Sequence, residues 1–134
     1  MINQLNSALV DIATRLFNYF NQEEKNDVRF YIGKTKDIER RREEHLKEKG
    51  LAITKEIANG NPEQICEAEK FLISFFKSHS TKAKCINESG GGEGDPDANI
   101  LYVSMDKLGG DASDPFDDEE SLHIEGLEPV IELK

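Results

Sequence analysis

The stretch of sequence that decides the fold is VRFYIGKTKDIERRREEHLKEKG, residues 28–50. Residues 28–34 are rich in β-branched and aromatic side chains and include Gly33 near their end, which predicts a strand. Residues 35–50 offer Thr35 or Asp37 as an N-cap and Gly50 as a stop, which predicts a helix. The central pattern is therefore a strand that leads directly into a highly charged helix.

The same order of strand and helix follows once more along the chain. Residues 51–58, LAITKEIA, predict a second strand that closes with a turn at residues 59–60. Asn61 as N-cap, Pro62 at the first helical position and Gln64 two residues later predict a helix that ends near Ser78. Residues 84–87 are predicted to be short and extended.

The outer segments complete the predicted architecture. The N-terminal residues predict a helix, because their apolar positions follow a helical spacing: Ile2, Leu5, Leu9, Ile12, Leu16 and Tyr19. Residues 100–105 and 129–133 predict two late strands after a glycine-rich connection at 89–99. We predict an α/β (α+β) fold, a small mixed or antiparallel sheet flanked by helices. Residues 1–98, with a core at 28–94, form the domain, and 99–134 form an acidic, partly β extension packed on or tethered to it.

Charge is distributed unevenly along the 134 residues, whose formal net charge is −10. Residues 1–87 hold 15 Lys and Arg against 13 Asp and Glu, or +2, and residues 88–134 hold 2 against 14, or −12. Six of these acids fall within residues 111–120. No run approaches the roughly 20 apolar residues of a membrane span. Cys66 and Cys85 lack the spacing of a zinc site or a disulfide framework, so we expect a cytoplasmic protein.

The first charged helix carries polar side chains where a core-facing helix would be apolar. Ile38 and Leu46 are predicted to share a face, and Arg41, Arg42 and His45 lie between them. Burying such groups costs free energy unless an anion or a functional site needs them. The alternative is a solvated helix whose aliphatic stems merely cover the sheet.

The later helix carries a carboxylate among its apolar positions, which are Ile65, Ala68, Leu72 and Phe76. Glu69 falls on this face, whereas Glu67 is predicted to face solvent. A buried carboxylate must be paired, protonated or bound to a metal ion. Mg²⁺ is often bound through one such carboxylate together with water and substrate phosphate oxygens. The alternative is a structural salt bridge from Glu69 to Arg41 or Arg42.

Together these residues resemble a known pattern. Residues 31–45, YIGKTKDIERRREEH, resemble the second half of the GIY-YIG nuclease signature. That half is a YIG strand, an arginine ten residues after its tyrosine (Arg41 after Tyr31) and a histidine four residues later (His45). Residues 69–73, EKFLI, resemble the family's helix with its metal-binding glutamate, and Asn87 before the glycines at 90–92 resembles its late asparagine. The resemblance covers roughly residues 28–94.

The first half of that signature is absent from the sequence. Family members have a GIY strand about a dozen residues before YIG, and this chain has no glycine before Gly33. Tyr19 lies twelve residues before Tyr31, but it also continues the helical pattern of the N-terminus. Either a strand begins near Leu16 with Tyr19 as the GIY tyrosine, or a helix has replaced that strand. The family is thought to need both tyrosines.

The resemblance implies an endonuclease that depends on a divalent metal ion and hydrolyses phosphodiester bonds, with DNA as the expected substrate. It implies that Glu69 holds Mg²⁺ or Mn²⁺ and that Arg41 binds the phosphate. Tyr31 or Tyr19 would orient or deprotonate the attacking water, His45 would relay a proton and Asn87 would position a partner. A further set would track the nucleic-acid backbone: Lys34, Lys36, Arg40 and Arg42.

Two alternatives remain open from the sequence. The domain could have lost cleavage and act as an interaction or regulatory module through a protein partner, or its acidic tail could mimic DNA. The tail could also contact the body itself and compete with phosphates for Lys34, Arg40 and Arg42, since a tethered polyanion has a high effective concentration there.

Overall fold

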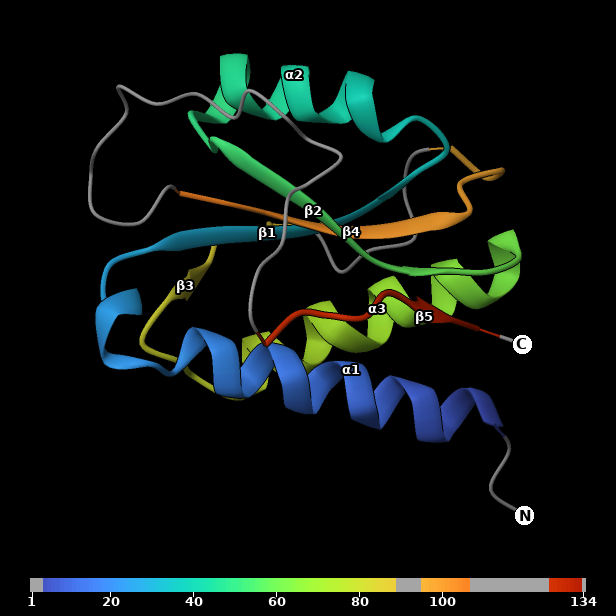
Figure 1. Cartoon of the computed structure of the whole chain (residues 1–134), viewed down its shortest axis with the longest axis horizontal. Coiled ribbons are helices and arrows are strands. Elements are labelled where there is room, and N and C mark those ends of the chain that lie inside the picture. The colour runs from blue at the N-terminus through green and yellow to red at the C-terminus, as the bar shows by residue number, and fades with distance from the viewer. Residues whose placement is uncertain (1–3, 89–94, 107–125, 134) are drawn as a thin grey trace.

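The computed structural model describes residues 4–88, 95–106 and 126–133, and it arranges them in three layers (Figure 1). Helix α2 (Ile38–Lys49) covers one face of a sheet, and helices α1 (Gln4–Phe20) and α3 (Pro62–Ser78) cover the other. The sheet consists of β1 (Arg29–Thr35), β2 (Ile53–Asn59), β3 (Lys84–Cys85), β4 (Ile100–Met105) and β5 (Ile131–Glu132). A short 3₁₀ turn, η1 (Glu23–Lys25), follows α1. The predicted α/β class is confirmed.

The strand order is β3-β1-β4-β2-β5, so the central strand comes from the C-terminal part of the chain. Strand β4 pairs antiparallel with β1 on one side and with β2 on the other. The two outer strands, β3 and β5, pair parallel with their neighbours. The predicted extension at 99–134 thus supplies the middle of the sheet. Its acidic run at 111–120 lies outside the described residues.

The N-terminal helix is built as its apolar spacing predicts, and it packs against the sheet. Leu9, Ile12 and Leu16 are buried, and Phe20 at its end is fully buried. The Phe20 ring stacks on Phe30 of β1 with centroids 3.9 Å apart, and Phe76 of α3 meets Phe30 edge-on at 5.3 Å. Burying one such ring contributes about 1.5–3 kcal/mol. The apolar core therefore lies between the sheet and the pair α1 and α3.

Helix α2 is capped at both ends, and the burial of its residues differs from the prediction at one position. Asp37 caps it by accepting a hydrogen bond from the Arg40 amide, and Gly50 ends it at φ 72°, a left-handed conformation that suits glycine. Leu46 was predicted to face the core with Ile38, but it is 52% exposed. Eight residues advance a helix about 80° past two full turns, while seven bring His45 back over Ile38. His45 is accordingly the buried residue of α2, and the prediction for Leu46 was wrong.

Helix α3 begins with the predicted capping box. The backbone amide of Gln64 donates to the Asn61 side chain, and the backbone amide of Asn61 donates to the Gln64 side chain. Its buried residues include Ile65, Ala68 and Leu72, and also Glu69, which is 6% exposed. Glu67 is exposed, as predicted. No helix in the described part of the chain is long and apolar enough to cross a membrane.

Candidate active site

The sheet face under α2 carries a row of polar and aromatic side chains. In the register of the sheet, Tyr31 of β1 lies opposite Ser104 of β4, and Ser104 lies opposite Thr54 of β2. In the row two residues further along, Gly33 lies opposite Tyr102. Because alternate residues of a strand share a face, Tyr31 and Gly33 face α2 while Phe30 faces the apolar core. This separation of Phe30 and Tyr31 follows the alternation expected of a strand.

Three ring side chains meet beneath α2. The His45 Nε2 and the Tyr102 hydroxyl are hydrogen-bonded at 2.7 Å. The Tyr31 ring lies 4.8 Å from the His45 ring and 6.5 Å from the Tyr102 ring, measured between centroids. His45 is 4% exposed and Tyr102 only 1%. We call Tyr31, His45 and Tyr102 the ring cluster.

Gly33 of the YIG segment makes room for the ring cluster. A Cβ atom at this position would lie 2.6 Å from Cζ of Tyr102 and still closer to its hydroxyl. No side chain larger than hydrogen fits there unless Tyr102 moves. The glycine of the YIG segment thus serves a close approach between β1 and the tyrosine of β4.

Burial and neighbouring charges set the protonation of the ring cluster. Burial lowers the pKa of His45 to about 4, and the cations Arg41 and Lys49 add to the effect while Glu44 opposes it. Burial also raises the pKa of Tyr102 above its usual value, with further increases from Tyr31, Glu69 and Glu44 and an opposing effect from Arg41. At neutral pH both side chains are therefore uncharged.

Arg41 and Glu69 act on the ring cluster from two different helices. Arg41 lies on α2, pairs with Glu44 at 3.0 Å, and influences the pKa of both His45 and Tyr102. Glu69 lies on α3, and its charge influences the pKa of Tyr102. Tyr102 is therefore the common neighbour of the residues predicted from the sequence: it is hydrogen-bonded to His45, and its pKa responds to Tyr31, to Arg41 and, from the helix on the other sheet face, to Glu69.

Two nitrogen atoms of this site are buried without a hydrogen-bond partner among the described residues: Nε of Arg41 and Nδ1 of His45. A buried polar group without a partner costs about 1–3 kcal/mol, so native proteins rarely keep one unless a ligand satisfies it. The Nε of Arg41 is always a donor, because the guanidinium stays protonated. The pair is suited to an oxygen-rich ligand.

Asn87 holds the open edge of β1 beside the ring cluster. Its side-chain amide donates to the Ile32 carbonyl at 2.8 Å, and its side-chain oxygen accepts from the Ile32 amide at 2.9 Å. Asn87 thereby continues, through its side chain, the backbone pairing that β3 makes with Phe30. It fixes the strand between Tyr31 and Gly33.

A family model described as the GIY-YIG catalytic domain matches residues 12–89, more than half of the chain. The chain belongs to the GIY-YIG family. No curated protein and no solved structure gives a significant match. Membership of this family supports a nuclease-type function that acts on nucleic acid.

Tyr19 lies apart from the ring cluster. This residue lies in α1, so a helix stands where the sequence left open a GIY strand. Its hydroxyl is 3.7 Å from Sδ of Met105, and its ring meets Phe20 edge-on at 5.0 Å. Tyr19 thus belongs to the layer of α1 and α3, on the sheet face opposite the ring cluster.

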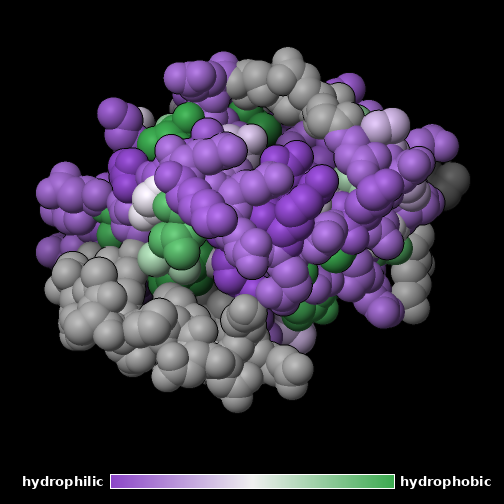
Figure 2. Space-filling view, turned by 90° about the horizontal axis from the view of Figure 1, so that it is seen from above, coloured by the Kyte–Doolittle hydropathy of each residue, from purple (hydrophilic) through white to green (hydrophobic). Residues whose placement is uncertain are grey.

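The four cations predicted to follow a nucleic-acid backbone have partners within the chain. Lys34 donates to the Asp95 carbonyl at 2.8 Å, and Lys36 lies 3.4 Å from the Asp95 carboxylate. Arg40 pairs with Glu44 at 3.8 Å and Arg42 with Glu39 at 2.6 Å. Lys36 and Arg40 remain exposed, whereas Lys34 is 6% exposed. Viewed from the α2 side, the described surface is mainly hydrophilic (Figure 2).

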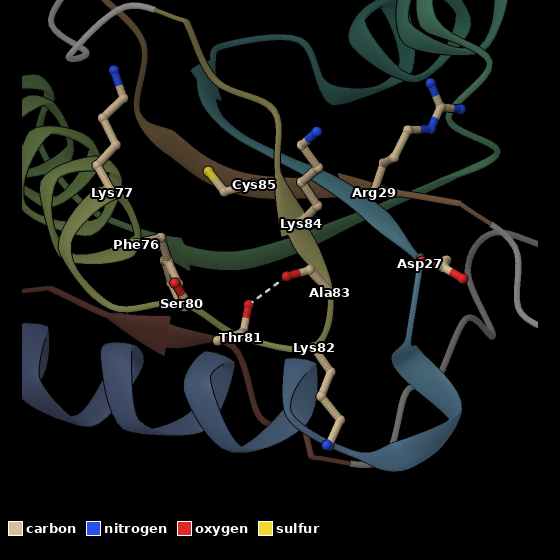
Figure 3. Close-up of a pocket in the computed structure, with 10 residues that line it drawn as sticks. All are labelled: Asp27, Arg29, Phe76, Lys77, Ser80, Thr81, Lys82, Ala83, Lys84 and Cys85. Carbon is tan, nitrogen blue, oxygen red and sulfur yellow. Dashed lines mark hydrogen bonds between the residues drawn. The ribbon is translucent and has the colours of Figure 1, made fainter.

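A basic pocket of about 580 Å³ opens at the β3 edge (Figure 3). Its lining includes four cations, Arg29, Lys77, Lys82 and Lys84, but they do not converge on one point. Arg29 is bonded to both oxygens of Asp106, and Lys77 donates to the Glu88 carbonyl. We therefore place the candidate active site at the ring cluster and not in this pocket.

Sequence analysis missed Tyr102, the residue on which the others converge. The segment ILYVSM reads as an ordinary strand, and nothing local to it indicates pairing with β1, about 70 residues earlier. The one available signal was indirect: Gly33 in a strand interior indicates close approach of another group. Thr54 and Ser104, whose buried hydroxyls are bonded at 2.6 Å, were missed for the same reason.

Proposed function

We propose that this protein is a divalent-metal-dependent endonuclease that hydrolyses phosphodiester bonds, with DNA as its substrate. The observation that carries the proposal is the proximity of Tyr31 to His45, together with buried nitrogens of Arg41 and His45 that have no hydrogen-bond partner among the described residues. The charge of Glu69 acts on Tyr102 in the same cluster. An anionic oxygen of a phosphodiester is a suitable partner for such donors.

The metal ion is best accommodated by Glu69. This carboxylate is 6% exposed and lies close enough to Tyr102 to influence its pKa. No group of three His, Cys, Asp or Glu side chains in the described part of the chain could hold a metal ion. A single carboxylate fits Mg²⁺ or Mn²⁺, which keep several water ligands and take the rest from substrate phosphate. When bound, such an ion would stabilise charge on the phosphate.

The side chains of the chain itself would bind and orient the substrate. Arg41 would donate to a phosphate oxygen, a charge-assisted bond that is stronger than a neutral one. Tyr31, half-buried at the edge of the ring cluster, would orient the attacking water. His45 is neutral at pH 7 and would move a proton, while Asn87 keeps β1 in register with these groups.

The nucleic acid would reach the site over α2 and the start of the loop before it. Lys36 and Arg40 are exposed there, and Lys34 and Arg42 lie closer to the sheet. For Lys36 and Arg40, exchanging the internal carboxylate partner for a phosphate would cost little, since exposed ion pairs contribute about 0–1 kcal/mol. We propose a reducing, cytoplasmic setting for the protein, as expected from the spacing of its two cysteines, Cys66 and Cys85.

The test is a plasmid-nicking assay with Mg²⁺ or Mn²⁺, comparing wild type with Glu69→Ala. We expect metal-dependent nicking that Glu69→Ala abolishes while its circular dichroism spectrum stays native. Glu67→Ala is the matched control, because Glu67 lies on the same helix but is exposed. If wild type never nicks and Glu69→Ala unfolds the protein, Glu69 is structural and the proposal is wrong.

A second candidate function is an inactive domain that serves as an interaction or regulatory module. It is favoured by one observation: α1 replaces the strand on which the family carries its first tyrosine, and Tyr19 faces the core. In that case the −12 C-terminal third would contact a basic protein partner or the body itself. Nucleic-acid binding without any metal-dependent nicking would support this candidate.

A further inference from the structure

The sheet topology indicates which strand stands in the position of the missing one. A strand whose tyrosine lies about a dozen residues before that of the YIG strand leaves only a short loop between the two strands, so they would form a hairpin and pair antiparallel. In this chain the antiparallel neighbour of β1 is β4, paired with it from Phe30–Met105 to Thr35–Ile100. Strand β4 also pairs with β2 on its other edge. The position beside the YIG strand is therefore filled from the C-terminal side of the chain.

Strand β4 brings a tyrosine to the centre of the site. Tyr102 lies opposite Gly33, the glycine of YIG, and its hydroxyl is hydrogen-bonded to His45 Nε2 at 2.7 Å. Tyr102 is 1% exposed, so it is held in one position by its surroundings. Tyr19, the tyrosine at the expected sequence distance, lies on the other face and bonds to Met105.

We propose that Tyr102 takes the place of the missing GIY tyrosine and acts as a positioning residue for His45, on a strand that follows the matched segment 12–89. This inference rests on the proposed nuclease function. It makes the central strand of the C-terminal region part of the active site.

The hydrogen bond also fixes which nitrogen of His45 carries the proton. The only bond of the Tyr102 hydroxyl in the described part of the chain is the one to His45. A buried hydroxyl that did not donate there would leave its proton unsatisfied, at a cost of about 1–3 kcal/mol. Tyr102 therefore donates to Nε2, and the proton of the neutral imidazole sits on Nδ1.

The consequence is a second donor beside Arg41. With its proton on Nδ1, His45 presents a buried N–H that has no partner among the described residues, as does Nε of Arg41. Two unpartnered N–H groups are complementary to the oxygens of a phosphodiester or to a departing oxygen. Tyr102 would act by holding His45 in this tautomer and never by touching the substrate itself.

The test combines cleavage with a direct view of the imidazole. Single-turnover cleavage and DNA binding are measured for Tyr102→Phe, and the ¹⁵N shifts of both His45 ring nitrogens are recorded at pH 7. We expect the cleavage rate to fall roughly tenfold to a hundredfold, with binding changed by no more than about twofold. Wild type should show the Nδ1–H tautomer, and Tyr102→Phe should lose that preference.

Ser104→Ala is the matched control. Ser104 lies on the same strand and face and is equally buried, but its hydroxyl bonds to Thr54 and not to His45. The control should lose stability and keep the His45 tautomer, which separates a positioning role from a merely structural one.

The outcomes distinguish this inference from the proposed function. If wild type cleaves and Tyr102→Phe cleaves equally well, the inference is overturned while the nuclease proposal stands. An Nε2–H tautomer in wild-type protein overturns the inference without any variant, even if Tyr102→Phe fails to fold. If wild type does not cleave, the nuclease proposal fails, and the tautomer of His45 still decides whether Tyr102 positions it.

Discussion

Two tyrosines lie on opposite faces of the same sheet, and their surroundings differ in kind. Tyr19 on α1 has a sulfur atom for its hydroxyl partner and phenylalanine beside its ring. Tyr102 on β4 has an imidazole for its hydroxyl partner, a second tyrosine nearby, and the charges of Arg41 and Glu69 acting on it. Both are less than a tenth exposed.

Distance along the chain is therefore a poor guide to which tyrosine lies beside the YIG strand. Tyr19 is twelve residues from Tyr31, yet α1 carries it to the apolar layer. Tyr102 is 71 residues from Tyr31, yet sheet pairing brings it to the neighbouring row. One face of the sheet is packed for stability, and the other gathers polar groups that cost stability unless they serve a ligand.

The largest expected effect contrasts these two faces. Arg41→Ala should reduce cleavage by roughly 10²–10³-fold and leave the free energy of unfolding nearly unchanged, because the proposed role of Arg41 is to bind the phosphate. Phe20→Ala should instead cost about 3–5 kcal/mol in urea unfolding, since it empties the stacked core against Phe30.

Lys47→Ala is the control for Arg41→Ala, because Lys47 is an exposed cation on the same helix. If Arg41→Ala and Lys47→Ala reduce cleavage equally, Arg41 contributes only to the general charge, and the polar face is not an active site.

A smaller effect is expected from pH, through the buried imidazole. The pKa of His45 is lowered from 6.5 to about 4 by burial, with Arg41 and Lys49 adding and Glu44 opposing; the phenols of Tyr31 and Tyr102 face it from the sheet. The unfolded chain therefore binds a proton at this site more readily than the folded one. Its contribution to stability is present above pH 6.5 and is lost as pH falls toward 4.

Between pH 7 and pH 5 this loss should be on the order of 2 kcal/mol for wild type. In urea unfolding over the same pH range, His45→Asn should show a loss of unfolding free energy smaller than that of wild type by this amount, since both proteins keep all other titrating groups. Parallel losses in the two proteins would show that His45 is not buried in its neutral form.

The sequence predicted those features that depend on interactions between residues close together in the chain. The helix at 62–78 was predicted because Asn61, Pro62 and Gln64 act within one turn. The burial of Glu69 and the exposure of Glu67 followed from helical spacing alone. Leu46 was wrongly predicted to be buried, because the predicted buried face of its helix included a position about 80° away from Ile38. On a helix, a shift of one residue decides whether a side chain is buried.

Long-range pairing explains what the sequence could not predict. Backbone hydrogen bonds join β1 to β4, and the side chains of neither segment indicate which strand it pairs with. Residues 100–105 were predicted as a strand, but neither its central place nor the role of Tyr102 could be inferred before its neighbours were known.

The smallest expected effect concerns the acidic run at 111–120, which follows β4 in the sequence. Replacing its six acids by Asn and Gln should tighten DNA binding roughly threefold to tenfold at low salt and hardly at all at high salt. The charge-matched control neutralises six exposed acids elsewhere: Glu23, Glu43, Glu48, Glu63, Glu67 and Glu88. A gain larger than in the control supports self-contact of the tail, and an equal gain shows that it acts through net charge alone.

The central claim, that the C-terminal strand supplies the second tyrosine of a nuclease site, is tested most directly by one comparison of rates. Single-turnover cleavage of a labelled DNA duplex is measured for wild type, Tyr19→Phe and Tyr102→Phe under identical metal and salt conditions. Each variant loses one hydroxyl group from a buried ring. We predict that Tyr19→Phe cleaves at the wild-type rate and that Tyr102→Phe is slowed at least about tenfold. A slow Tyr19→Phe beside a fast Tyr102→Phe would contradict the account.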